Sequence, residues 1–63
     1  MTVKLIKHTH IGSIYCIYDL AGRPIGQVEW KMAGPNVGQY FYSMDSKYKP
    51  AKLRKIFRSA PRT

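Results

Sequence analysis

The side chains most able to do chemistry in this chain are the cations near its C-terminal end. The stretch KYKPAKLRKIFRSAPR, residues 47–62, contains seven basic residues and no acidic one. Clustered ammonium and guanidinium groups attract phosphates and carboxylates. Along a helix, like charges three or four residues apart repel one another by a few tenths of a kcal/mol. A cluster that costs stability in this way indicates a bound polyanion, and a solvated surface that maintains solubility is the alternative.

The positive charge is segregated along the chain. The 63 residues include eleven Lys and Arg and three Asp and Glu, which gives a net charge of +8. Residues 1–45 contain four of the cations and all three acids, for a net charge of +1, and residues 46–63 contribute the remaining +7. Charge clustered in this way favours nucleic acid as the partner.

We therefore predict a non-enzymatic nucleic-acid-binding module, with duplex DNA preferred over RNA. Most of the predicted contacts are to phosphates, while one lysine and one exposed tyrosine extend the surface onto neighbouring strands, where rings beside cations stack on bases. The predicted contact residues are Lys47, Lys49, Lys52, Arg54, Lys55, Arg58, Arg62, Lys31 and Tyr15. The alternative function is a small adaptor or inhibitor that docks on an acidic surface of a protein partner.

The other reactive side chains do not form a recognisable site. His8 and His10 lie on one side of an extended segment, but zinc needs three or four ligands, and only Cys16 and Asp19 could be added. A thiol in the middle of an apolar strand is usually inert packing. The glycines of GRPIG follow a turn and open a strand, whereas a phosphate-binding loop opens a helix. We expect no catalytic site, no metal site and no cofactor.

Length and composition predict one small basic domain spanning residues 1–63. A chain of this size buries only ~60% of the surface that it exposes when unfolded, and its hydrophobic fraction of 44% suits a globular fold. Cys16 is the only cysteine, which suits a reducing compartment. The longest apolar run, residues 14–18, is too short to span a bilayer, and the first ten residues lack the apolar centre of a signal peptide. We expect a cytoplasmic protein without membrane contact.

The first half of the chain predicts strands. A short strand of uncertain length surrounds residues 3–5, and residues 11–18 are rich in β-branched and aromatic side chains. In the second strand we expect the inward face to consist of Ile14, Cys16 and Tyr18, which leaves Tyr15 on the opposite side. The following turn, DLAGRP, opens at Asp19, takes positive φ at Gly22 and ends with Pro24 at the start of a strand.

Residues 25–32 give the clearest strand of the chain, because their alternation is regular. One face has Val28, Trp30 and Met32, and the other has Gln27, Glu29 and Lys31. A loop, AGPNVG, follows, and QYFYSM then predicts one more strand. Which side chains of this strand face inward stays open: either Tyr40, Tyr42 and Met44 point inward, or Phe41 does.

The basic stretch itself predicts a helix. Its apolar residues recur at i, i+3, i+4 and i+7, as expected for one face of a helix: Leu53, Ile56, Phe57 and Ala60. Asp45 or Ser46 can cap the start, Pro50 is tolerated in the first turn and Pro61 ends the helix. We expect Trp30 to be buried with Val28 against this apolar stripe.

Together these elements predict an α+β fold, a small antiparallel sheet of three or four strands with one C-terminal helix packed on it. A small β-barrel with a helical tail is the alternative. The layout, with GSIYCIYDLAGRPIGQVEW as its first hairpin, resembles the small DNA-binding domains of some integrases. That resemblance implies a sheet that enters the major groove, and it is one of layout without a shared motif.

Overall fold

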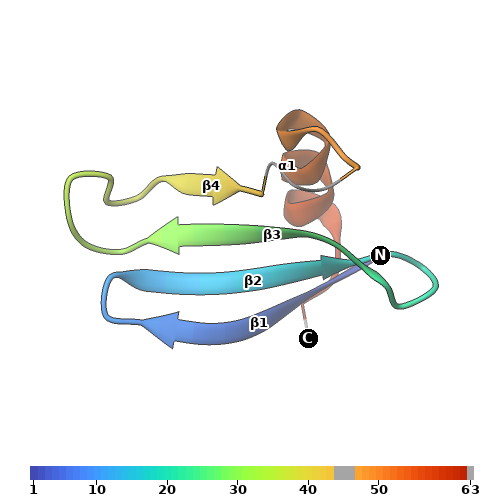
Figure 1. Cartoon of the computed structure of the whole chain (residues 1–63), viewed down its shortest axis with the longest axis horizontal. Helices are drawn as coiled ribbons and strands as arrows, with labels where there is room; N and C mark the ends of the chain where they lie inside the picture. Colours follow the sequence, from blue (N-terminus) through green and yellow to red (C-terminus); the bar gives the residue numbers. More distant parts are fainter. Residues whose placement is uncertain (44–46, 63) are drawn as a thin grey trace.

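The structure is a computed structural model and describes residues 1–43 and 47–62. Within these ranges an antiparallel sheet of four strands precedes one helix: β1 Thr2–Thr9, β2 Gly12–Tyr18, β3 Pro24–Lys31, β4 Tyr40–Tyr42 and α1 Pro50–Ser59. The strands lie side by side in chain order, with β1 and β4 at the two edges (Figure 1). The predicted α+β fold is confirmed, and the barrel alternative is wrong because the sheet is open.

Helix α1 packs on one face of the sheet. Among the described residues, the core cluster consists of five buried side chains from the sheet and the helix: Val3, Ile17, Val28, Leu53 and Phe57. After the helix, the chain passes behind β2 and β1 in the view of Figure 1. It then joins the free edge of β1, where the Val3 amide donates a hydrogen bond of 2.9 Å to the Pro61 carbonyl. The chain that follows the helix is thereby held to the edge of the sheet.

Cross-strand pairing assigns each side chain to a face, because residues directly opposite one another point the same way. Val3 lies opposite Ile17, and Tyr15 lies opposite Val28. Since Val3, Ile17 and Val28 all belong to the core under the helix, Tyr15 faces the helix as well. We call this the helix side of the sheet, and the opposite one the outer face.

The predicted orientation of β2 is therefore wrong. Ile14, Cys16 and Tyr18 point to the outer face, and Tyr15 points to the helix side. Both faces of β2 are apolar, so alternation within this strand does not distinguish them. The pairing with β3 decides, because it places Tyr15 beside the buried Val28.

Gly26 explains why the helix can approach this face. It lies opposite Ile17 on β3, and a Cβ added there would be only 2.9 Å from Leu53 Cδ2. Such a distance is shorter than normal carbon–carbon contacts. Glycine at this position therefore makes room for the Leu53 side chain directly on the sheet.

The alternation predicted for β3 is confirmed, but the burial predicted for its end is not. Val28 is fully buried, whereas Trp30 is only half-buried and Met32, which follows the strand, is 54% exposed. The core cluster consists of side chains nearer to the start of β3 and includes neither Trp30 nor Met32. The helix is too short to cover the whole sheet, so one end of the helix side stays open.

The turns follow the predicted chemistry. The Asp19 carboxylate accepts hydrogen bonds of 2.9 Å from the amides of Ala21 and Arg23, and Gly22 has φ of 83°. Residues 32–39 form the second loop, in which Gly34 also has positive φ.

The pairing of β4 with β3 determines which side chains of β4 face the helix. Tyr40 lies opposite Trp30 and Tyr42 opposite Val28, so both tyrosines face the helix side and Phe41 faces outward. Met44, which belongs to the same alternative as these tyrosines, lies outside the described residues.

The helix differs from prediction at its start. It begins at Pro50, and its N-cap position is Lys49, whose side chain makes no capping hydrogen bond. The expected caps, Asp45 and Ser46, lie outside the described residues, and the position of Lys49 excludes them as the N-cap. The apolar stripe is confirmed by Leu53 and Phe57, both buried. Among the described residues, no helix has the length and apolar content needed to cross a membrane.

Candidate nucleic-acid interface

The cations of α1 form two groups around the buried stripe. Arg54 and Arg58 are four residues apart, so they share one flank of the helix. Lys52 lies on the opposite flank, where its Nζ is 5.4 Å from the centre of the Tyr48 ring. Lys55 points away from the sheet, and each of these four side chains is exposed. Lys47 and Lys49 are exposed too, in the segment that precedes the helix.

The arginine flank faces β4. Burial raises the pKa of the Tyr42 phenol above its ordinary value, and the positive charges of Arg54 and Arg58 act in the opposite direction, as does Arg62. A cation lowers the pKa of a phenol only when it lies close to it. Arg54 and Arg58 on one flank of α1, and Arg62 after the helix, therefore all act on the phenol of Tyr42.

The Arg62 side chain also makes contacts that stabilise the fold. Its guanidinium carbon is 4.0 Å from the centre of the Phe57 ring and 5.8 Å from that of Tyr15. One of its nitrogens also donates a hydrogen bond of 2.6 Å to the Phe57 carbonyl. That carbonyl belongs to the last turn of α1, where acceptors lack partners within the helix. Arg62 thus caps the helix while adding its charge to the arginine flank.

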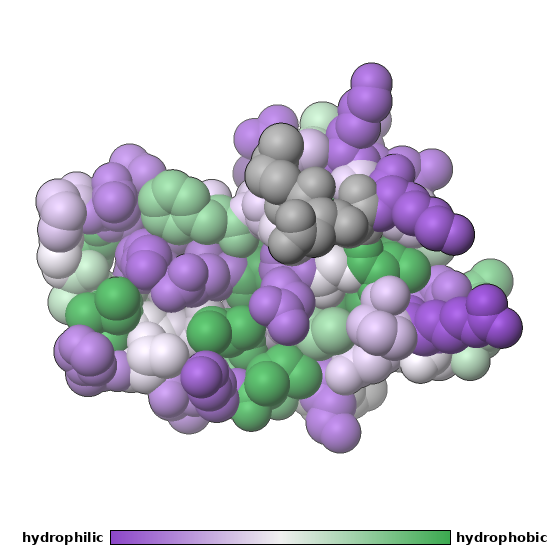
Figure 2. Space-filling view, viewed as in Figure 1, coloured by the Kyte–Doolittle hydropathy of each residue, from purple (hydrophilic) through white to green (hydrophobic). Residues whose placement is uncertain are grey.

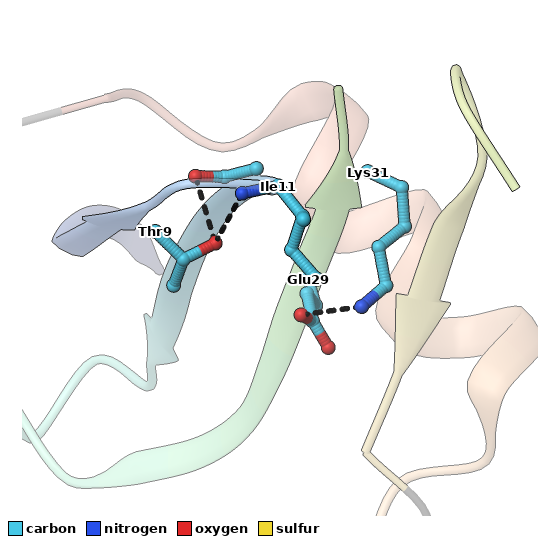
Figure 3. Close-up of polar contacts among 5 residues, drawn as sticks. Thr9, Ile11, Glu29 and Lys31 are labelled. Atoms are coloured by element: carbon cyan, nitrogen blue, oxygen red, sulfur yellow. Dashed lines mark hydrogen bonds and ion pairs between the residues drawn. The ribbon is translucent and has the colours of Figure 1, made fainter. Parts of the chain in front are cut away.

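The helix cations have no acidic partners among residues 1–43 and 47–62. The ion pair within these ranges joins Lys31 to Glu29 on β3, with 2.8 Å between Nζ and Oε2. Figure 3 shows this pair near the β1–β2 turn, where the Thr9 hydroxyl accepts a hydrogen bond from the Ile11 amide. Both members of the pair lie on the outer face, away from α1.

Two predicted contact residues are therefore not where they were expected. Lys31 is on the outer face, bound to Glu29 and 5.9 Å from the centre of the Phe41 ring, so it does not extend the basic surface of the helix. Tyr15 is on the helix side, but its ring is half-buried and makes an edge contact of 5.3 Å with Phe57. It packs against the helix instead of standing free in solvent.

A row of side chains that the sequence analysis did not propose crosses the open end of the helix side. It runs over all four strands, because each of its members lies opposite the next. We call it the open row: His8, Ser13, Trp30 and Tyr40, of which Ser13 is buried. The Trp30 and Tyr40 rings are stacked, with centroids 6.2 Å apart and planes 21° apart. The alternation of β3 already indicates in the sequence that Trp30 shares a face with Val28. The sequence does not show how far along the sheet the helix extends.

The histidines and the thiol have local roles. The His8 ring accepts from or donates to the Ser13 hydroxyl through Nδ1 at 2.9 Å, and His10 lies in the turn after β1. Cys16 is 5% exposed and lies 3.8 Å from the Ile17 carbonyl oxygen. In the part of the chain that the structure describes, no group of three or more His, Cys, Asp or Glu side chains is placed to hold a metal.

Comparison with known proteins provides no relative for this chain. No protein family, curated protein or solved structure matches it. The resemblance of the predicted layout to integrase DNA-binding domains is not supported by a structural match. Any function must be argued from the geometry of this chain.

Proposed function

We propose that this protein is a non-enzymatic nucleic-acid-binding module in which α1 and its flanking residues contact phosphates. One observation carries the proposal: seven cations lie on or beside a single helix, and none of them pairs with an acid among the described residues. Phosphates would relieve the repulsion between neighbours such as Arg54 and Arg58. Release of counterions from the nucleic acid would supply much of the binding free energy.

The shape of the helix supports a duplex as one substrate. The ten residues of α1 form a rod about 15 Å long, with a diameter of ~10–12 Å. One side of this rod packs on the sheet, and the other presents cations to solvent. A B-DNA major groove about 12 Å wide admits a helix of this diameter. Contacts to phosphates position a protein without reading sequence, so we propose binding of low sequence specificity.

Salt dependence tests this proposal directly. Four to six phosphate contacts imply a slope of about −4 to −5 when log affinity for duplex DNA is plotted against log salt concentration. Replacing Lys52, Lys55 and Arg58 together by Gln should leave the fold intact, because all three side chains are exposed and Gln keeps the helix propensity. The triple variant should flatten the slope by about three units.

Two results would contradict the proposal. One is a folded triple variant that binds duplex DNA with the parental slope. The other is a parent protein that binds neither random-sequence DNA nor RNA at low salt.

The outer face favours a second function, docking on an acidic protein partner. Phe41 is 43% exposed there, and Ile14, on the other side of Glu29, is half-buried. Figure 2 shows this face, with hydrophobic atoms over β1 and β2 among hydrophilic ones. Binding to polyglutamate but not to nucleic acid would favour this function. For either function we propose a cytoplasmic location, which the single buried thiol of Cys16 suits.

A further inference from the structure

Two members of the open row, Trp30 and Tyr40, form an aromatic surface next to α1, whereas Ser13, between Trp30 and His8, is buried. Tyr40 is 47% exposed, Trp30 is half-buried, and His8 is exposed at the far end of the row. Leu5, on the same side of β1, is 36% exposed. Large side chains of this kind are normally enclosed when a second layer covers a sheet. Here the helix covers them only in part, since Phe57 contacts Tyr40, and the rest of Tyr40 and part of Trp30 stay accessible to solvent.

A continuous series of ring contacts connects this surface to the helix. Trp30 stacks on Tyr40, and the Tyr40 centroid is 5.5 Å from that of Phe57, in the middle of α1. The guanidinium of Arg62 in turn lies over the Phe57 ring. The exposed rings are therefore only one side chain away from a cation.

The arginine flank lies on the same side of the helix as the rings. Arg54 and Arg58 act on the Tyr42 phenol, and Tyr42 is two residues from Tyr40 on β4, with its side chain on the same face. A ligand that covers Tyr40 thus lies one ring, that of Phe57, from the guanidinium of Arg62, and Arg54 and Arg58 add positive charge to the same border. The surface combines flat apolar rings with positive charge at their border.

This combination matches the chemistry of an unpaired nucleotide. A base in a single strand offers an open π-face that stacks on an aromatic side chain, and its phosphate binds a neighbouring cation. In a duplex the base faces are covered by adjacent base pairs. Cations alone bind both forms, so the exposed rings are the feature that distinguishes them.

We propose that the open row is a stacking platform for unpaired bases, and that a single strand of DNA or RNA crosses it with its phosphates at Arg54 and Arg58. This stacking platform depends on the nucleic-acid binding proposed above, and it specifies that this face selects single strands. Tyr40 and Trp30 would each receive one base, since each ring keeps an accessible surface.

Fluorescence of Trp30 provides the direct test, because it is the only tryptophan in the chain. The probes are a twelve-nucleotide oligo(dT), an oligo(U) of equal length, an abasic strand with the same number of phosphates, and a duplex. Stacking predicts that saturating oligo(dT) and oligo(U) quench the emission and that the abasic strand does not. It also predicts that oligo(dT) binds more tightly than the abasic strand at equal salt.

Variants of single rings separate stacking from charge. Tyr40→Leu should weaken oligo(dT) binding by about 5- to 150-fold, the range for losing one stacked base, and should leave binding of the abasic strand unchanged. Phe41→Leu is the matched control, because Phe41 is similarly exposed, at 43%, on the outer face. It should bind oligo(dT) like the parent. Thermal melting of both variants identifies any loss that comes from unfolding.

The two proposals fail in different ways. If oligo(dT) and the abasic strand bind equally and neither quenches Trp30, the stacking platform is overturned while phosphate binding by α1 stands. The same conclusion follows if folded Tyr40→Leu and Phe41→Leu bind oligo(dT) with equal affinity. If no nucleic acid binds at low salt, both proposals are overturned.

Discussion

The two faces of this sheet are both apolar, yet only one of them receives the helix. On the helix side, Leu53 sits against Gly26 and Phe57 sits among tyrosine rings. On the outer face, Phe41 stays 43% exposed, and the nearby cation, Lys31, is paired with Glu29. The difference shows that apolar content alone does not choose the buried face. A position without a side chain, which allows close approach of a helix, contributes to that choice.

The largest expected effect comes from removing the ring at the centre of the helix side. Phe57 is 5% exposed and contacts the rings of Tyr15, Tyr40 and Tyr42. Phe57→Ala should cost about 3–5 kcal/mol, which is comparable with the total stability of a domain of this size. Phe41→Ala, on the outer face, should cost a third of that or less. Thermal or urea unfolding of the two variants measures the difference.

Equal melting temperatures for the two variants would contradict this comparison. Such a result would remove the helix from the core and make the two faces equivalent.

The second effect tests the close approach at Gly26. In Gly26→Ala the new Cβ would meet Leu53 Cδ2 at 2.9 Å, so the helix must shift or Leu53 must change rotamer. Overpacking of this kind typically costs about 1–3 kcal/mol. Gln27→Ala, one residue further along β3 and exposed on the outer face, should change the stability by no more than about 0.5 kcal/mol. Equal effects in urea unfolding would show that the helix does not depend on the glycine.

These contacts also show what the sequence could and could not predict. Strand positions followed from alternation and from Asp19, Gly22 and Pro24 in the turn, each of which acts locally. The side of β2 that faces the helix depends on pairing with β3, which alternation within one strand does not contain.

The candidate site was predicted to a similar extent. The basic helix followed from the spacing of its apolar stripe and its lack of acids. The open row at Trp30 and Tyr40 depends on where a ten-residue helix stops on the sheet, and the pairing of Lys31 with Glu29 depends on two side-chain conformations. Such features are tertiary, and periodicity does not reveal them.

A smaller effect concerns the thiol of the outer face. Cys16 points away from the helix but is only 5% exposed, with Lys4 and Gln27 directly opposite it on the two neighbouring strands. We expect slow reaction with a bulky disulfide reagent in the native state and fast reaction in denaturant. Gln27→Ala should accelerate native labelling, since it uncovers one side of the sulfur. Native labelling as fast as in denaturant would contradict the burial of this thiol.

The smallest expected effect is a shift in the titration of the Tyr42 phenol. Because burial raises the pKa of Tyr42, this phenol should ionise later than a free tyrosine near pH ~10. The native state then holds the proton more tightly, so its contribution to stability is present below the unfolded-state pKa and is lost as pH rises through the folded-state pKa. Ultraviolet absorption should show a late phenolate component that Tyr42→Phe removes.

The arginine flank should act on this titration, and the lysines should not. Replacing Arg54 and Arg58 by Gln removes two charges that favour the phenolate, so the pKa of Tyr42 should rise further. Replacing Lys52 and Lys55 by Gln should leave it where it is. The reverse pattern would place the lysines, and not the arginines, beside β4.

The central claim is that phosphates bind to the helix and not to the net positive charge as a whole. Two variants with equal net charge test it: Arg54→Gln/Arg58→Gln on α1, and Lys4→Gln/Lys7→Gln on β1, where both lysines are exposed. The measurement is affinity for one duplex over a range of salt concentrations. We predict that the arginine variant binds more weakly and flattens the log–log slope by about two units, while the lysine variant keeps the parental slope. Equal losses in the two variants would contradict the claim, because binding would then follow net charge wherever it lies.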